Sequence, residues 1–235
     1  MTAARRVAAL DWEAIGRALA VDGFATTPPV LDAAGARALA ALFPRDRQFR
    51  TTVDMARHRF GEGRYRYFAH PLPRAVAALR AAFYARLAPI ANAWRTALGE
   101  PPDFPARLDA FLARCAAAGQ RRPTPLLLAY GAGGWNALHQ DRYGAVAFPL
   151  QVTIQLSRPG VDFDGGEFLL VEQRPRQQSV GHAVALRQGE AVIFANDWRP
   201  VAGTRGHYRG TVRHGVSRVR RGARCTLGLI FHDAA

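Results

Sequence analysis

The sequence predicts an α+β fold, in which a mainly helical first half packs against a β-sandwich or barrel formed by the second half. Residues 1–120 are rich in alanine, and their apolar residues recur at three- and four-residue intervals, a spacing typical of amphipathic helices. After Arg121-Arg122-Pro123, short apolar or alternating runs are separated by Gly and Pro, which is typical of a sandwich or barrel. We expect a single domain over residues 1–235, with a mainly helical part at 1–120 and the sheet core at 121–235.

Four helices are expected in the first half, because four alanine-rich segments are bounded by Pro, Gly or Asp, residues that begin or end helices. These segments are Trp12–Val21, Leu31–Leu42, Pro73–Leu98 and Pro105–Ala118. The third has one continuous apolar face, made by Val76, Leu79, Phe83, Leu87, Ile90 and Trp94. A face of this kind predicts a helix packed on the core.

Six strands are expected in the second half. They are Leu126–Tyr130, Phe148–Ser157, Glu167–Glu172, Ala183–Leu186, Ala191–Phe194 and Arg224–Phe231. In the second of them apolar and polar residues alternate, so one face is apolar and the other, with Gln151 and Thr153, is able to carry chemistry.

The chain carries 32 basic side chains against 18 acidic ones, and it contains no lysine. Arginine binds phosphate oxygens with two parallel hydrogen bonds, so this excess favours a nucleic-acid partner. A coding bias towards GC explains the use of Arg in place of Lys, but it does not explain the excess of positive charge. The segment Arg57–Phe68 interleaves arginines with aromatic residues. This mixture suits the binding of phosphates and exposed bases. It also fits an ordinary strand or hairpin with a solvated basic face.

Further arginines in the second half are expected in loops near the mouth of the site. They are Arg174, Arg176, Arg199, Arg205, Arg209 and Arg213.

The two cysteines, Cys115 and Cys225, are far apart in sequence and have no redox or metal-binding spacing, which argues against a disulfide framework or a thiolate zinc site. No apolar run reaches the roughly 18 residues needed to span a membrane, and the first residues do not resemble a secretory signal. We therefore expect a cytoplasmic protein without a membrane partner.

A metal site is predicted at His139, Asp141 and His214. His139 and Asp141 are two residues apart, so on an extended segment both side chains lie on the same face, and His214 must arrive from another strand. Two histidines and one carboxylate are the ligands of mononuclear Fe(II) oxygenases, and they leave coordination positions open for O₂ and a cosubstrate. The same three ligands also occur in zinc hydrolases.

The segment Leu126–Phe231 resembles the Fe(II)/2-oxoglutarate dioxygenases, especially the prolyl-hydroxylase-like branch. Four motifs carry the resemblance: Tyr130-Gly-Ala-Gly-Gly-Trp-Asn-Ala-Leu-His-Gln-Asp141, Phe163-Asp-Gly-Gly-Glu-Phe168, Gln188-Gly-Glu-Ala-Val-Ile-Phe194 and His214-Gly-Val-Ser-Arg-Val-Arg-Arg-Gly-Ala-Arg224. The resemblance implies a double-stranded β-helix, or jelly-roll, barrel with the helical half packed on it.

The same resemblance implies roles for individual residues. His139, Asp141 and His214 would bind Fe(II), and Arg224 would bind the far carboxylate of the cosubstrate 2-oxoglutarate. Tyr130 would add a hydroxyl group to that carboxylate, with Thr226 and Thr153 as further pocket residues. His207 and His232 complete no motif of the family, so we expect neither to be a ligand.

Nearly the whole chain is similar to a bacterial family of oxygenases described as oxidative demethylases of damaged DNA. The similarity lies in Arg64–Phe68, Arg122–Leu128, Gln173–Ser179 and Arg213–Arg220. It implies attack by O₂ and 2-oxoglutarate on an N-methyl group of DNA or RNA, with release of succinate and formaldehyde, on a base that is unpaired or taken out of the stack.

Other functions stay open. The spacing from His214 to Arg224 follows the prolyl-hydroxylase-like pattern more closely than that of the better-known alkylated-base dioxygenases. Hydroxylation of a protein side chain by the same centre is therefore the main enzymatic alternative. A catalytically inert metal-binding barrel is the non-enzymatic alternative, and a zinc hydrolase would leave Arg224 without a purpose.

Overall fold

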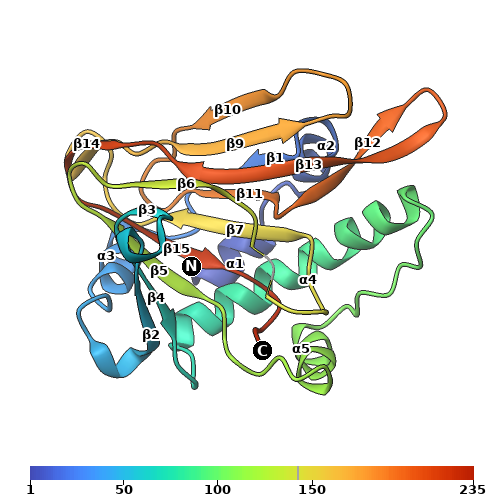
Figure 1. Cartoon of the computed structure of the whole chain (residues 1–235). Coiled ribbons are helices and arrows are strands. Elements are labelled where there is room, and N and C mark those ends of the chain that lie inside the picture. Colours follow the sequence, from blue (N-terminus) through green and yellow to red (C-terminus); the bar gives the residue numbers. More distant parts are fainter. Residues whose placement is uncertain (142) are drawn as a thin grey trace.

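Two antiparallel sheets face each other, and helices cover the outer side of one of them (Figure 1). The computed structural model describes residues 1–141 and 143–235. The helices are α1 (Ala3–Ala8), α2 (Trp12–Asp22), α3 (Ala33–Ala40), α4 (Arg74–Ala97) and α5 (Leu108–Ala117), with short 3₁₀ turns η1 (Asp46–Gln48) and η2 (Ala56–His58). The strands are β1 (Phe24–Thr26), β2 (Phe49–Asp54), β3 (Gly61–Glu62), β4 (Arg64–Phe68), β5 (Leu126–Tyr130), β6 (Trp135–His139), β7 (Leu150–Gln155), β8 (Phe163–Gly165), β9 (Phe168–Gln173), β10 (Val180–Val184), β11 (Ala191–Ala195), β12 (Trp198–Gly203), β13 (Gly206–Val216), β14 (Val219–Gly222) and β15 (Arg224–Leu229).

The larger sheet has seven strands in the order β1-β11-β7-β15-β5-β4-β2. The smaller sheet runs β10-β9-β13-β6-β3, with β12 added as a hairpin partner of β13, and β14 and β8 form a separate pair. These antiparallel sheets with packed helices confirm the predicted mixture of helix and sheet. They also place β6 and β13, which carry the predicted histidines, next to each other in the smaller sheet.

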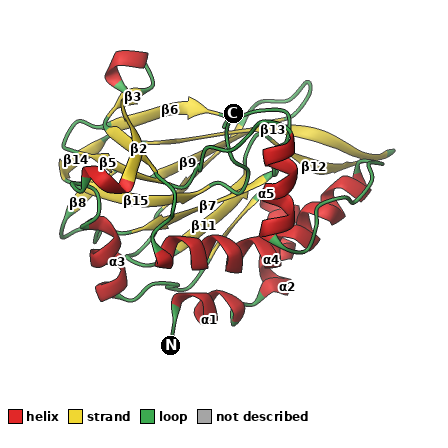
Figure 2. Ribbon diagram, turned by 90° about the horizontal axis from the view of Figure 1, so that it is seen from below, coloured by secondary structure: helices red, strands yellow, loops and turns green. Residues whose placement is uncertain are grey.

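The four expected helices appear as α2, α3, α4 and α5, and α1 was not expected. Helix α4 lies beneath the seven-stranded sheet (Figure 2). Its Leu79, Phe83 and Leu87 are fully buried in the same hydrophobic core as Leu127 and Ile154 of that sheet. This is the apolar face that the three- and four-residue spacing of the apolar residues predicted. In the part of the chain that the structure describes, no helix combines the length and apolarity needed to cross a membrane.

The first half also contains strands, because residues 1–120 supply β1, β2, β3 and β4 in addition to the five helices. Strand β1 is one edge of the seven-stranded sheet, while β4 and β2 form the other edge. Their residues, such as Thr51, Val53, Tyr65 and Tyr67, favour strands, but the runs are short and stand among alanine-rich segments. Residue 120 is therefore not a boundary between helices and sheets.

Five of the six expected strands match β5, β7, β9, β11 and β15, and the expected Ala183–Leu186 lies slightly beyond β10. Strand β15 has the two faces that its alternation indicates. Cys225, Leu227 and Leu229 pack in the helix-side core, whereas Arg224 and Thr226 line a cavity on the other side of the sheet. The alternation thus directs the polar residues of this strand towards the space between the two sheets.

Several arginines expected at the mouth of the site have structural partners elsewhere. Arg199 is 2% exposed, and its Nε donates to Glu172 Oε2 at 2.5 Å. Its Nη1 and Nη2 each donate, at 2.8 Å, to the carbonyls of Ala20 and Val21 in the last turn of α2. Arginines at a helix C-terminus satisfy carbonyls that lack a partner within the helix, so this residue fastens α2 to the sheets.

Two other arginines of the basic segments, Arg66 and Arg209, are similarly occupied. Arg66 binds Asp46 at 2.7 Å and lies 4.4 Å from the centre of the Phe49 ring. Arg209 is paired with Glu100 and lies 4.6 Å from the Trp198 ring centre. The lining of the cavity described below, taken over residues 1–141 and 143–235, includes none of the six loop arginines.

Candidate active site

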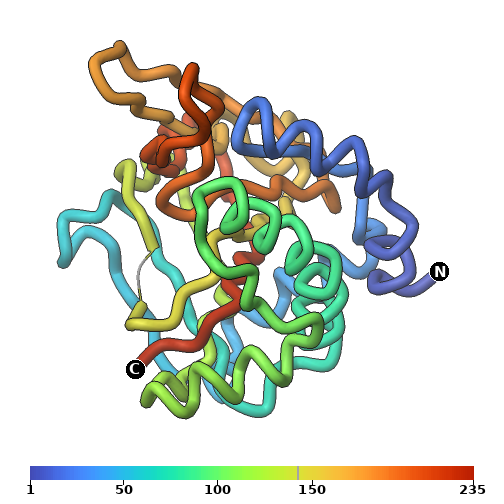
Figure 3. Tube along the Cα trace, turned by 90° about the vertical axis from the view of Figure 1, so that its right-hand side faces the viewer, coloured from blue at the N-terminus to red at the C-terminus, as the bar shows by residue number. Residues whose placement is uncertain are grey.

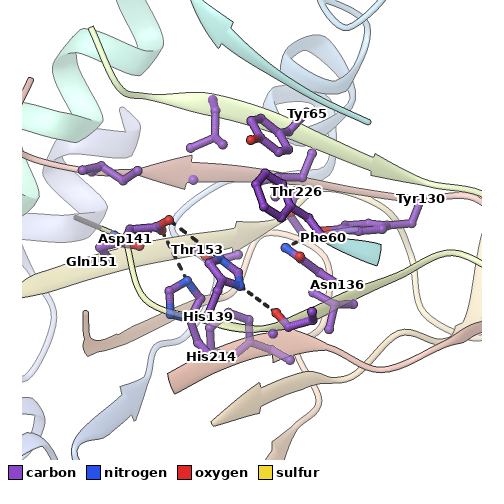
Figure 4. A pocket seen from close by; sticks show the side chains of 18 of the residues that line it. Phe60, Tyr65, Tyr130, Asn136, His139, Asp141, Gln151, Thr153, His214 and Thr226 are labelled. Carbon is purple, nitrogen blue, oxygen red and sulfur yellow. Dashed lines mark hydrogen bonds and ion pairs between the residues drawn. The ribbon is translucent and has the colours of Figure 1, made fainter. Parts of the chain in front are cut away.

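A cavity of about 260 Å³ lies between the two sheets and collects most of the predicted site residues (Figure 4). The smaller sheet contributes His139 and His214, and the larger sheet contributes Tyr130, Arg224 and Thr226. Strands β4, β5 and the segment after β15 add an aromatic and aliphatic wall. Its members are Tyr65, Tyr67, Leu126, Leu128 and Ile230.

His139, Asp141 and His214 form a cluster in which one donor atom from each lies within 4.8 Å of the others. The ladder of β13 and β6 places His214 directly opposite His139, and Asp141 follows two residues after β6 ends. The Nε2 atoms of His139 and His214 both face Asp141, at 3.7 Å from Oδ1 and 3.4 Å from Oδ2. Donors this close together would bind a single metal ion, and two histidines with a carboxylate suit iron or zinc.

The protonation states also fit a metal site. Nδ1 of His139 donates to the carbonyl of Ala137 at 2.7 Å, which leaves the Nε2 lone pair directed at the cluster. Burial lowers the pKa of His214, which favours the neutral ring that a metal ligand needs. Burial opposes ionisation of Asp141, but hydrogen bonding to His214 and the nearby histidines outweigh it and hold the pKa of this carboxyl well below its usual range.

Three residues hold Asp141 in place, and sequence reasoning assigned this role to none of them. The Tyr143 hydroxyl donates to Oδ1 at 2.6 Å, and Nε2 of Gln151 donates to Oδ2 at 3.1 Å. Asn196 accepts from the Asp141 backbone N–H at 3.1 Å and donates to its carbonyl. Of the three, Gln151 was indicated by the sequence, because it lies on the polar face of a predicted strand.

Arg224 is 2% exposed, and its Nε and Nη1 atoms have no hydrogen-bond partner among the described residues. A buried guanidinium without partners is costly, because it loses its hydration without compensation. Its location beside the cluster fits the far carboxylate of a dicarboxylic acid such as 2-oxoglutarate, which would satisfy these N–H groups with charge-assisted bonds.

Tyr130 and Thr226 share this end of the cavity. The ring centre of Tyr130 lies 5.6 Å from the Arg224 guanidinium carbon, and its hydroxyl accepts from Asn136 Nδ2 at 3.4 Å. Burial raises the pKa of Tyr130 to about 12, so the phenol keeps its proton and is able to donate it in a hydrogen bond. Thr226 is 1% exposed, and Thr153 lines the same cavity from β7.

The two remaining predicted non-ligands lie outside the cluster. His207 is exposed near the distant end of β13. His232 is fully buried after β15, where its Nδ1 accepts the Phe148 backbone N–H at 3.2 Å, and its Nε2 has no partner in the described part of the chain. Burial lowers the pKa of His232 to about 4, so it stays neutral in the folded protein.

His232 is expected to make the fold sensitive to acid. Between about pH 6.5 and about pH 4 the unfolded chain binds a proton at this residue and the folded chain does not, so stability falls as the pH falls through this window. The expected loss is on the order of 2–3 kcal/mol. Urea unfolding across this pH range, on the metal-free wild type and on His232→Asn, measures the loss of stability. The asparagine keeps an acceptor for the Phe148 N–H. Equal pH profiles for the two proteins would contradict the assignment.

Comparison with known proteins identifies the family. A protein-family model described as "Oxygenase, catalysing oxidative methylation of damaged DNA" matches residues 63–234. The uncharacterized proteins Rv2227 and MT2286 from two strains of Mycobacterium tuberculosis are each 54% identical over 168 residues, which cover 72% of this chain and 72% of theirs.

Solved structures show the same fold at low identity. A prolyl-4-hydroxylase from Pseudomonas putida has a TM-score of 0.55 at 19% identity, covering 95% of this chain and 99% of that one. A 2OG-Fe(II) oxygenase-family oxidoreductase from Burkholderia pseudomallei has a TM-score of 0.56 at 20% identity, covering 95% and 93%. The predicted oxygenase class is confirmed by the family match, and the fold together with the His-Asp-His cluster fits iron and 2-oxoglutarate. The chain is thus an oxidoreductase, and it belongs to the family of oxygenases described as acting on damaged DNA.

Proposed function

We propose that the chain is an Fe(II)/2-oxoglutarate-dependent dioxygenase, built on a double-stranded β-helix, that removes N-methyl groups from nucleic-acid bases and releases formaldehyde and succinate. The observation that carries the proposal is the buried, unpartnered guanidinium of Arg224 in the same cavity as the His139, Asp141 and His214 cluster. A metal site alone fits several enzyme classes, whereas this arginine adds a place for a dicarboxylic cosubstrate.

In this proposal His139, Asp141 and His214 hold the iron, and Arg224 holds the far carboxylate of 2-oxoglutarate. Iron and 2-oxoglutarate supply the oxidation of a C–H bond by O₂, coupled to conversion of the cosubstrate into succinate and CO₂. The protein orients the side chains that would bind the metal. Tyr143 and Gln151 fix the Asp141 carboxylate from both sides, and the hydrogen bond to Ala137 fixes the ring of His139.

The aromatic wall is the proposed place for the substrate. Tyr65 and Tyr67 meet edge to face at 5.5 Å, and the Tyr67 hydroxyl is hydrogen-bonded to Tyr143 at 3.0 Å. The Tyr65 hydroxyl makes no hydrogen bond with a side chain or backbone group of the described residues, which leaves it for a ligand. Flat aromatic surfaces suit a planar base, and they also exclude water from the reacting group.

The direction of the proposed reaction follows from its reagents. O₂ and 2-oxoglutarate contain no transferable methyl group, so oxidation at the methyl of a methylated base leads to its loss as formaldehyde. The net charge of +14 supports a polyanionic substrate. The description of the matching family points to damaged DNA.

The test is reconstitution with Fe(II) and 2-oxoglutarate without oxygen, followed by aerobic assay of succinate and formaldehyde. Methylated single-stranded DNA, its unmethylated counterpart and methylated RNA are compared. We expect formaldehyde that depends on the methyl group and matches the additional succinate. Succinate without formaldehyde, stimulated by proline-containing peptides, would instead support side-chain hydroxylation. Neither product from iron-loaded protein would support a catalytically inert member of the family.

A further inference from the structure

The segment that joins β2 to β4 places an aromatic and basic rim at the mouth of the cavity. Phe60 lines the cavity and is nevertheless 47% exposed (Figure 4). The ring of His58, also exposed, stacks on it with ring centres 5.4 Å apart and planes at 22°. This segment, with η2 and β3, stands out from the side of the molecule opposite α1 (Figure 3). Two parallel rings thus form a flat surface that leads into the cavity.

The rim is held firmly to the sheets. Met55, at its base, is fully buried, and its N–H donates to the Gly63 carbonyl at 3.0 Å. The Phe60 N–H donates to the Met55 carbonyl at 3.0 Å, while its own carbonyl accepts from Ala137 at 2.8 Å. Because Ala137 is on β6, two residues before His139, the backbone of Phe60 has a fixed position relative to the metal cluster.

Positive charge flanks the exposed rings. Arg57 and Arg59 are exposed, and neither makes an ion pair or side-chain hydrogen bond within residues 1–141 and 143–235. Arg66 and Arg209, by contrast, are occupied by Asp46 and Glu100. Two free guanidinium groups beside a flat aromatic surface suit a chain of phosphates whose bases are accessible for stacking.

We infer that this rim binds single-stranded nucleic acid next to the nucleotide that enters the cavity. The Phe60 ring, backed by His58, stacks on a neighbouring base, and Arg57 and Arg59 contact the phosphates on either side. The bases of an intact duplex have no free face for Phe60, so the rim selects unpaired strands. The inference rests on the proposed function and assigns its substrate contact to particular residues.

The aromatic contact is tested by fluorescence anisotropy with a short fluorescein-labelled oligothymidylate. Loss of one stacked base corresponds to about 5- to 150-fold in affinity, and we expect Phe60→Ala to weaken binding by about tenfold or more. Phe60→Tyr should bind like the wild type. Val180→Ala is the matched control, because Val180 is also 47% exposed but lies on β10.

The charges are tested with two double variants that remove the same net charge. Arg57→Ala with Arg59→Ala should reduce the dependence of log affinity on log salt by about 1.4. The control variant, Arg176→Ala with Arg205→Ala, changes two exposed arginines in the β9–β10 and β12–β13 connections. It should reduce the salt dependence of the affinity much less.

The inference is overturned if Phe60→Ala binds as the wild type does, or if the two arginine pairs have equal effects. The formaldehyde assay separates this failure from failure of the proposed function. Wild-type turnover on methylated single strands, with an unchanged KM in Phe60→Ala, refutes the rim and leaves the demethylase. A wild type that neither binds the oligonucleotide nor releases formaldehyde refutes both.

Discussion

Replacing His214 by alanine is expected to abolish turnover, with a loss of about 1000-fold or more, and to release the iron. His214 is 5% exposed and supplies the donor that faces Asp141 from β13, so its loss leaves two of the three proposed ligands. Bound iron is measured by elemental analysis after dialysis, and turnover by succinate release.

The control for this variant is His207→Ala, because His207 is on the same strand but exposed and outside the cluster. It should keep its iron and its activity. Circular dichroism shows whether each variant is folded. If folded His214→Ala retained stoichiometric iron and turned over within about tenfold of the wild type, the ligand assignment would be wrong.

Replacing Arg224 by methionine is expected to raise the KM for 2-oxoglutarate by about 100-fold or more, because removing one member of a buried charge pair costs 2–5 kcal/mol or more. The unliganded protein should be as stable as the wild type or more so, since methionine fills similar space and removes a buried guanidinium with unpartnered N–H groups. Thermal unfolding and cosubstrate titration measure the two effects separately.

A second 2-oxo acid sharpens the experiment. 2-Oxobutyrate has the metal-binding end of 2-oxoglutarate but no distal carboxylate. The wild type should prefer 2-oxoglutarate strongly, and Arg224→Met should lose that preference. A variant with an undiminished preference would show that some other group holds the far carboxylate.

The residues that sequence reasoning located best are those whose spacing or alternation carries the information. His139 and Asp141 are two residues apart and both line the cavity, and the alternation in Arg224–Phe231 separates the cavity side from the core side. The four long helical segments were also predictable, because their apolar periodicity extends over two or more turns.

What could not be predicted depends on partners distant in the chain. Asp141 is held by Gln151 and Asn196, which lie 10 and 55 residues further along the chain and come next to it only after folding. From the sequence, Arg199 is expected to be a charged residue of an exposed loop. The two carbonyls that it binds lie 178 and 179 residues earlier, in α2. The sequence placed His139 on an extended segment and His214 on another strand, but it did not give the bounds of β6 and β13. Strand β13 contains several Gly and Arg residues, so pairing in the sheet overrides its weak local propensity.

The division of the site between two sheets has a consequence for motion. His139 and His214 belong to the smaller sheet, whereas Arg224 belongs to the larger one. With the metal and cosubstrate bound as proposed, a single small molecule ties one sheet to the other across the gap. A ligand that contacts both sheets of the folded protein would stabilise their packing against each other. The bound cosubstrate would therefore connect the two sheets as well as take part in the reaction, and the shorter succinate would connect them less well.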